Sequence, residues 1–172
     1  MTQAAIEVRR LSPSDAALFR EIRLEGLRLE PDAFTSTFES ENLQPLSFFA
    51  DRLAGAAVFG AFRGSEPVGV AGFFIQQGAK HAHKGTLWGM YVQARARQEG
   101  IGRMLVERVL EHARTEVEQI QLVVVGDNHA ARRLYARLGF EEYGLEKRAA
   151  KYRGRYHDDV LMAKMLLLEP EP

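Results

Sequence analysis

Residues 90–105 read Met-Tyr-Val-Gln-Ala-Arg-Ala-Arg-Gln-Glu-Gly-Ile-Gly-Arg-Met-Leu and decide the fold. An apolar strand ends at Val92, and the spacing Arg97-x-x-Gly100-x-Gly102 then leads directly into a helical pattern. Glycine lets the backbone pass close to a ligand, and a helix start offers unpaired N–H groups at the positive end of its dipole. Arg97 adds a permanently charged, forked donor. The stretch therefore predicts a turn that binds a pyrophosphate.

The same turn excludes two other phosphate-binding loops. A Walker A loop requires Gly-Lys followed by Ser or Thr, and the turn contains no such sequence. A dinucleotide-binding fingerprint needs a third small residue three places after Gly102, where Leu105 stands. The alternative is that Gly100 and Gly102 only tighten a β–α turn, and a second motif further along the chain decides between the two.

Hydrophobic periodicity supplies the elements around this turn. Strands are predicted at residues 6–11, 56–62, 68–76, 84–92, 120–125, 141–146 and 156–167. Helices are predicted from the Ser-Pro-Ser-Asp segment at 12–15 to Pro31, and at 46–53, 101–117 and 128–138. The apolar run 120–125 is expected to be buried on both faces. This order predicts an α/β fold: a mixed, mostly antiparallel twisted sheet with one right-handed parallel βαβ unit and helices on both faces.

The second motif, residues 128–140, reads Asn-His-Ala-Ala-Arg-Arg-Leu-Tyr-Ala-Arg-Leu-Gly-Phe. One helix and one apolar strand separate it from the first, and the ordered pair resembles the two motifs of the GNAT superfamily of N-acetyltransferases. With the flanking strands, the resemblance covers nearly the whole chain, and residues 144–165 are similar to the family's closing hairpin. The sequence departs at Ala94, where the family often has proline, and at Gln98, where it often has glycine.

The resemblance implies a GNAT-like fold with acetyl-CoA as cosubstrate and no metal. The strand that ends at Val92 and the strand 120–125 are expected to splay apart, so that the pantetheine arm pairs with free backbone groups of Met90 and Val92. Backbone N–H groups of residues 98–103 would hold the pyrophosphate, and Asn128, also the expected N-cap, would meet the pantetheine arm. The residues implied in cofactor binding are Met90, Tyr91, Val92, Arg97, Gln98, Glu99, Gly100, Ile101, Gly102, Arg103, Met104, Asn128, Ala131 and Tyr135.

Acetyl transfer to an amine needs a neutral nitrogen, a polarised carbonyl and a proton for the departing thiolate. The chain contains no cysteine, which excludes a thiol acetyl-enzyme and favours direct attack in a ternary complex. Tyr135 lies seven residues after Asn128 and four after Ala131, on one helix face. With the resemblance of this motif it is the expected catalytic acid, and the alternative is a core tyrosine whose hydroxyl is satisfied locally. No base stands out, and the conceivable ones are Glu25, His83, His157, Asp158 and Asp159.

The acceptor is left open between a small molecule and a peptide or protein N-terminus. Glu39 and Glu41 could form a cation site, and a basic series could receive a carboxylate: Lys147, Arg148, Lys151, Arg153 and Arg155. The alternative, which the sequence favours for both groups, is a solvated surface. Four aromatic side chains line either an acceptor pocket or the core: Phe34, Phe38, Phe73 and Trp88. His81 and His83 would share one face of a strand, but without a third ligand no metal site is expected.

Composition limits the classes of partner that the chain is expected to bind. The 172 residues predict one domain, and 23 basic residues balance 23 acidic ones, so neither nucleic acid nor a membrane is an expected partner. The first residues lack the apolar core of a secretory signal, so the expected location is cytoplasmic. Dimerisation through the late strands is left open. The competing functions are a non-catalytic acyl-CoA sensor on the same fold and a structural module whose glycine turn binds nothing.

Overall fold

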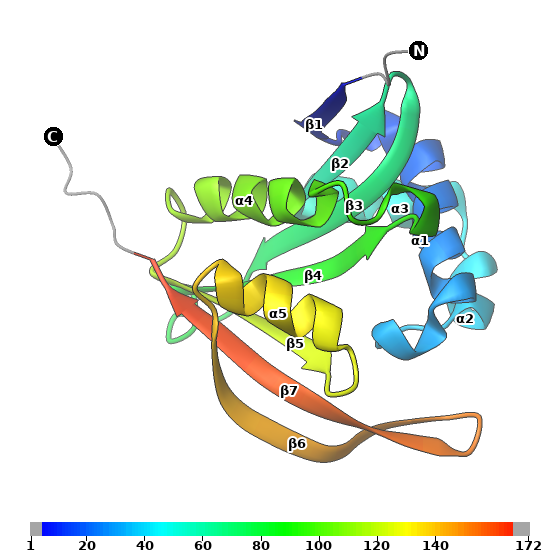
Figure 1. The fold of residues 1–172 in the computed structure, drawn as a ribbon. Coiled ribbons are helices and arrows are strands. Elements are labelled where there is room, and N and C mark those ends of the chain that lie inside the picture. The colour runs from blue at the N-terminus through cyan, green and yellow to red at the C-terminus, as the bar shows by residue number, and fades with distance from the viewer. Residues whose placement is uncertain (1–4, 167–172) are drawn as a thin grey trace, which may run out of the picture.

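The computed structural model describes residues 5–166. They contain one seven-stranded sheet with helices packed against it (Figure 1). Along the chain the strands are β1 (Ile6–Arg10), β2 (Ala57–Arg63), β3 (Glu66–Ile75), β4 (Lys84–Val92), β5 (Gln119–Val125), β6 (Glu141–Tyr152) and β7 (Arg155–Met165). Their order in the sheet is β1-β2-β3-β4-β5-β7-β6. Only β4 and β5 pair in parallel, and every other neighbouring pair is antiparallel. The predicted mixed, mostly antiparallel sheet is confirmed.

The helices are α1 (Ala16–Leu29), α2 (Phe38–Asn42), α3 (Leu46–Gly55), α4 (Ile101–Ala113) and α5 (His129–Arg137). Figure 1 shows α1–α3 on one side of the sheet and α4 and α5 on the other. Each side has its own apolar core, with Phe19 and Phe49 packed on Val58 on one side and Leu105 packed near Ile120 on the other. Within residues 5–166, no helix has the length and the apolar run needed to cross a membrane.

The parallel pair β4 and β5 stays together for only part of its length. Residues 84–86 pair with residues 119–121, after which the two strands have no further pairing with each other. Residues 87–92 and 122–125 therefore diverge, while β4 continues to pair with β3, and β5 with β7. The predicted splay of these strands is confirmed, and it leaves backbone N–H and C=O groups facing an opening between them.

The prediction that β5 is buried on both faces is wrong. Ile120, Leu122 and Val124 are buried under α4 and α5, but the side chain of Val123 on the opposite face is 52% exposed. The helices α1 and α3 pack on β2, β3 and β4 and leave that face of β5 uncovered. A continuous apolar run is therefore a poor guide to burial where the covering layer stops partway across the sheet.

Several element boundaries differ from prediction. Helix α4 ends at Ala113 rather than at residue 117, the one-turn helix α2 was not predicted, and β6 extends to Tyr152, six residues beyond prediction. A register shift between Glu146 and Ala150 breaks the side-chain alternation of β6, which hid the rest of the strand. Residue 167, the predicted end of the last strand, lies outside the described residues.

Candidate functional site

The turn between β4 and α4 presents backbone donors. Gln98 (φ 64°) and Gly100 (φ 79°) both adopt the left-handed conformation, and Gly100 is the N-cap of α4. No side chain of the described residues caps this helix, and its first internal bond runs from the Met104 N–H to the Gly100 carbonyl at 3.0 Å. The N–H groups of residues 101–103 are thus available at the positive end of the dipole. This geometry fits the predicted anion site.

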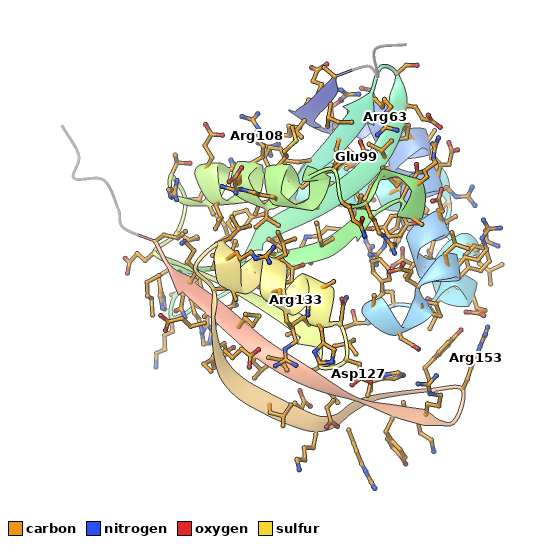
Figure 2. The ribbon with its side chains drawn as sticks, viewed as in Figure 1. Arg63, Glu99, Arg108, Asp127, Arg133 and Arg153 are labelled. Carbon is orange, nitrogen blue, oxygen red and sulfur yellow. The ribbon has the colours of Figure 1, made fainter. Side chains whose placement is uncertain are left out.

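Side chains of the turn point away from these donors. Figure 2 shows Glu99 and Arg63 turned toward one another, and the two form an ion pair. Ile101 is buried in the core, and Arg103 pairs with Glu107 one turn along α4 at 2.7 Å. Within this segment the backbone of residues 98–103, rather than its side chains, is what the structure offers to a ligand.

Arg97 fastens the turn to the end of α1. Its Nε donates to the Val92 carbonyl at 3.0 Å, and its terminal nitrogen forms an ion pair with Glu30. The guanidinium therefore already has partners within the chain. One of them is the Val92 carbonyl, which was expected to meet the pantetheine arm.

Glycine is favoured at positions 100 and 102 of the motif for two different physical reasons. A Cβ on Gly102 would lie 3.0 Å from the Met90 Cε and 3.2 Å from the Leu134 Cδ2, so glycine here lets α4 begin close to β4 and α5. A Cβ on Gly100 would meet nothing within 4 Å, and what favours glycine there is the positive φ. Gly102 thus has a packing role that was not foreseen.

Strand β4 bulges where it leaves β5. Gly89 (φ 63°) and Met90 together oppose the single residue Ala71 on β3, as the register shift between the two strands shows. Met90 packs against the α4–α5 core, whereas the Tyr91 side chain lies on the α1 side and is 4% exposed. The Tyr91 side chain therefore does not face the β4–β5 opening, and its backbone pairs with Val70 on β3.

Tyr91 and Gln93 both donate hydrogen bonds to Glu25, one of the candidate bases. Burial, together with the hydrogen bond to Glu25, raises the pKa of the Tyr91 phenol. The Tyr91 hydroxyl donates to Glu25 at 2.9 Å, and the Gln93 amide donates to the other Glu25 oxygen at 3.0 Å. Both carboxylate oxygens of Glu25 are therefore engaged in fixing α1 against β4.

Helix α5 carries the candidate acid. The Asn128 Oδ1 accepts from the Ala131 N–H at 3.2 Å, so the predicted N-cap is confirmed. Tyr135 is 5% exposed, and its ring packs edge-on against Phe140 with 5.8 Å between centroids. Burial raises the pKa of the Tyr135 phenol, and no hydrogen bond from another described residue contributes to that shift. The hydroxyl is therefore protonated at neutral pH.

A hollow of about 320 Å³ lies between the end of α1, the end of β5 and the start of β7. It is lined by Leu29, Glu30, Pro31, Asp32, Ala33, Val125, Asp127, Asn128, Arg155 and His157. Figure 2 shows Asp127 at the turn that follows β5. Glu30, Asp32 and Asp127 were missed by sequence reasoning, because no local pattern reports that the end of α1 packs near β7.

Other candidates from the sequence do not assemble into one site. His81 and His83 lie in a turn before β4 rather than in a strand, and no group of three metal-ligating side chains occurs among residues 5–166. Phe73 is buried under α4, whereas the remaining three aromatic candidates, Phe34, Phe38 and Trp88, pack on the α1 side. The four cannot line a single acceptor pocket.

Glu41 belongs neither to a cation site nor to a solvated surface, the two alternatives that the sequence offered for it. Arg23 donates to both oxygens of Glu41, at 2.8 and 3.0 Å, and Arg52 lies 3.2 Å from the same carboxylate. Arg23 and Glu41 are 5% and 3% exposed. The carboxylate is thus neutralised inside the α1–α2–α3 layer and is closed to an external cation.

The acidic and basic residues of the β6–β7 hairpin have separate roles. The Asp158 Oδ1 accepts from the Arg148 N–H at 2.8 Å and so stabilises the β6 bulge. Burial, followed by the charge of Glu146, raises the pKa of Asp159. Figure 2 shows Arg153 at the tip of the hairpin, where it pairs with Glu39 at 3.3 Å. Of the basic series, Arg155 lines the hollow.

Comparisons with known proteins agree with this geometry. The model of the acetyltransferase (GNAT) family matches residues 24–140. The L-amino acid N-acetyltransferase AaaT of Escherichia coli is 30% identical over 93 residues, which are 53% of this chain and 57% of that protein. The match thus spans little more than half of that relative.

Solved structures extend the likeness to nearly the full chain. A GNAT-family acetyltransferase of Streptococcus pneumoniae is 26% identical and superposes with a TM-score of 0.82 over 94% of this chain and 99% of its own. The yncA structure of Salmonella typhimurium, solved with its cofactor acetyl-CoA, is 22% identical and has a TM-score of 0.80 over 98% of each chain. The second likeness shows the fold alone.

Proposed function

Because the chain belongs to the acetyltransferase (GNAT) family, we propose that it transfers the acetyl group of acetyl-CoA to a primary amine by direct attack in a ternary complex. The observation that carries this proposal is the opening between β4 and β5 next to a helix start without a side-chain cap. The opening offers strand edges to an extended arm, and the helix start offers N–H groups to a pyrophosphate.

The positions of the described residues support the following cofactor contacts. Met90 and Val92 lie on the edge of β4 that β5 leaves unpaired, and Met90 together with the Val92 N–H would pair with the amides of the pantetheine arm, because the Val92 carbonyl already accepts from Arg97. The backbone N–H groups of residues 98–103 would hold the diphosphate. The Oδ1 of Asn128 is occupied by the helix cap, so its amide NH₂ group is the part left to meet the arm.

Acetyl-CoA supplies an activated acetyl group as a thioester. Tyr135 lies on α5, two helical turns after Asn128, and its hydroxyl is proposed to donate a proton to the leaving sulfur. The raised pKa of the phenol keeps that proton in place until the sulfur develops charge. Asn128 and Ala131, on the same face of α5, would position the arm so that the sulfur reaches the hydroxyl.

A steady-state assay of CoA release tests the proposal. The wild-type protein is given acetyl-CoA and a panel of primary amines: free L-amino acids, their carboxamides, polyamines and peptides with free N-termini. We expect CoA release that depends on the amine and is matched by an equal amount of N-acetylated product. The name of the Escherichia coli relative makes free amino acids the first class to assay.

The competing function is a sensor that binds acyl-CoA without turnover. Tight acetyl-CoA binding by calorimetry, with no CoA release across the panel, would favour the sensor and contradict the enzyme. Absence of any thermal shift with acetyl-CoA would contradict both, because a ligand at 100 times its Kd stabilises the folded state by about 2.7 kcal/mol.

A further inference from the structure

The hollow beside the β5 end is adjacent to the proposed cofactor groove. Its walls come from the Pro31–Ala33 turn, from Val125 at the end of β5 and from the first residues of β7. Asn128 lines the hollow and also caps the helix that carries Tyr135. A molecule in the hollow would therefore meet the same end of β5 that the pantetheine arm is proposed to approach from the other side.

His157 is a buried group in this hollow without a hydrogen-bond partner. The residue is 7% exposed, and its Nε2 makes no hydrogen bond among the described residues. The nearest acid, Asp32, has its Oδ1 3.3 Å from that nitrogen but outside hydrogen-bonding geometry. An unpaired buried polar atom destabilises the folded state, so a ligand that satisfies it gains affinity.

Charges of both signs line the hollow. Alternation along β7 places Arg155 and His157 on one face, and Arg155 forms no ion pair with another described residue. Asp32 and Asp127 contribute carboxylates from the other two walls. A guanidinium on one side and carboxylates on the other complement a small molecule that carries both an ammonium and a carboxylate.

We propose that this hollow binds the acceptor as a small zwitterionic amine of the α-amino acid class. Arg155 binds its carboxylate, and the His157 Nε2 takes the proton from its ammonium group, where the nearby Asp32 carboxylate stabilises the imidazolium that forms. The proposal rests on the proposed acetyltransferase function, and it supplies the base that sequence reasoning left unassigned. Of the five candidate bases, only His157 lines the hollow. Asp158 and Glu25 are in addition engaged in hydrogen bonds that hold β6 and β4.

The proton balance closes with these groups. The neutral His157 imidazole takes one proton from the ammonium, and the neutral nitrogen then attacks the thioester carbonyl carbon. A C–N bond forms, the C–S bond breaks, and the sulfur takes the Tyr135 proton. The phenolate regains a proton from the attacking nitrogen, and the imidazolium releases its own to solvent. The net products are the N-acetyl amino acid, CoA and one proton.

The first arm of the test is His157→Gln, which keeps a polar side chain of similar reach but cannot take up a proton. We expect kcat/KM for an L-amino acid to fall about 100-fold or more, while acetyl-CoA affinity and Tm stay within error.

The pH profile of kcat/KM separates the role of His157 as a base from a structural role. In the wild type, both the His157 imidazole and the substrate amine must be deprotonated for the reaction to occur. In the variant only the amine must be, so the plot of log kcat/KM against pH rises less steeply on its acidic side. The charged groups that share the hollow or the strand with the imidazole are Glu30, Asp32, Asp127, Arg155 and Asp159.

The second arm tests the carboxylate contact with Arg155→Gln and a matched control, Arg153→Gln, at the hairpin tip outside the hollow. For an L-amino acid and for its carboxamide, the kcat/KM of the wild type is divided by that of the variant. The basicity of each amine affects both values equally, so it cancels from the ratio. We expect Arg155→Gln to lower the value about 10–100-fold for the amino acid and less than threefold for the carboxamide. Arg153→Gln should change neither.

Calorimetric titration of the same amino acid into the CoA-bound protein measures binding to the hollow directly. It therefore tests the proposed acceptor site even if the protein shows no turnover. If the wild type releases no CoA but the amino acid binds, and Arg155→Gln abolishes the binding, the enzyme proposal fails and the assigned pocket stands. If the wild type acetylates amines but His157→Gln retains the wild-type rate and pH profile, the base assignment is overturned while the enzyme proposal stands. Equal loss on amino acid and carboxamide would overturn the assignment of Arg155.

Discussion

Replacing Gly102 by aspartate places a negative charge within the first turn of α4, where the pyrophosphate is proposed to bind. A Cβ at this position would lie 3.0 Å from the Met90 Cε and 3.2 Å from the Leu134 Cδ2. Both atoms are ends of flexible side chains, so a shift of a few tenths of an ångström accommodates the new atom. The steric part of the change is shared by Gly102→Asn, which has the same shape without the charge and is the matched control.

The charge sets the size of the expected effect. Two unit charges about 5 Å apart interact with about 0.8 kcal/mol in water and about 3 kcal/mol at an effective dielectric constant of 20. Gly102 is half-buried, so the added repulsion should fall between these values. That range corresponds to a 4–150-fold weaker acetyl-CoA affinity for Gly102→Asp than for Gly102→Asn.

Calorimetric titration of acetyl-CoA into both folded variants provides the measurement, and a salt series adds a second criterion. The difference between Asp and Asn should shrink as ionic strength rises, because salt screens a partly exposed charge. Equal acetyl-CoA affinities for the two variants at low salt would refute the placement of the pyrophosphate at this helix start.

Three further variants test separate parts of the structure. Tyr135→Phe should lower kcat about 10–1,000-fold in the CoA-release assay with acetyl-CoA affinity unchanged, and a wild-type rate with chemistry rate-limiting would make Tyr135 a packing residue. Glu41→Gln should lower the free energy of unfolding by about 3–5 kcal/mol in a denaturant titration, because it leaves Arg23 buried without its charge partner. Although burial opposes it, the bonds and charges of Arg23 and Arg52 lower the pKa of Glu41, so its stabilising effect is present above the ordinary carboxyl pKa of about 4.3 and is lost as the pH falls below it. Gln98→Gly should raise the free energy of unfolding by about 0.5 kcal/mol, since it relieves a left-handed φ of 64°, and a loss of acetyl-CoA affinity would instead assign the cofactor contact to the Gln98 side chain.

The parts of the fold that could be predicted are those written locally in the chain. The Arg97-x-x-Gly100-x-Gly102 turn and the motif at residues 128–140 indicated the family, and the family match over residues 24–140 confirms it. The Asn128 cap and the helix it begins follow from residue type and spacing, and the structure contains both. The positive φ of Gly100 is compatible with its residue type but is not predicted by it, because Gln98 also has a positive φ and Gly102 has none.

The parts that could not be predicted depend on contacts between distant segments. Nothing local in the sequence reports that Asp32, just after α1, comes within 3.3 Å of His157 on β7. The same holds for the exposure of Val123, which depends on where the layer of α1 and α3 stops, and for the burial of Glu41 against Arg23. The two motifs therefore indicate where acetyl-CoA is expected to bind, whereas the hollow proposed for the acceptor is formed by segments that only the folded chain brings together.

A crystal structure of the protein with CoA and an L-amino acid tests the central claim most directly. The account predicts CoA between β4 and β5, with its diphosphate on the N–H groups of residues 98–103 and its sulfur at the Tyr135 hydroxyl. The amino acid should occupy the hollow, with its amine at His157 and its carboxylate at Arg155. CoA bound elsewhere on the protein, or an amino acid seated with its amine away from the sulfur, would contradict the account.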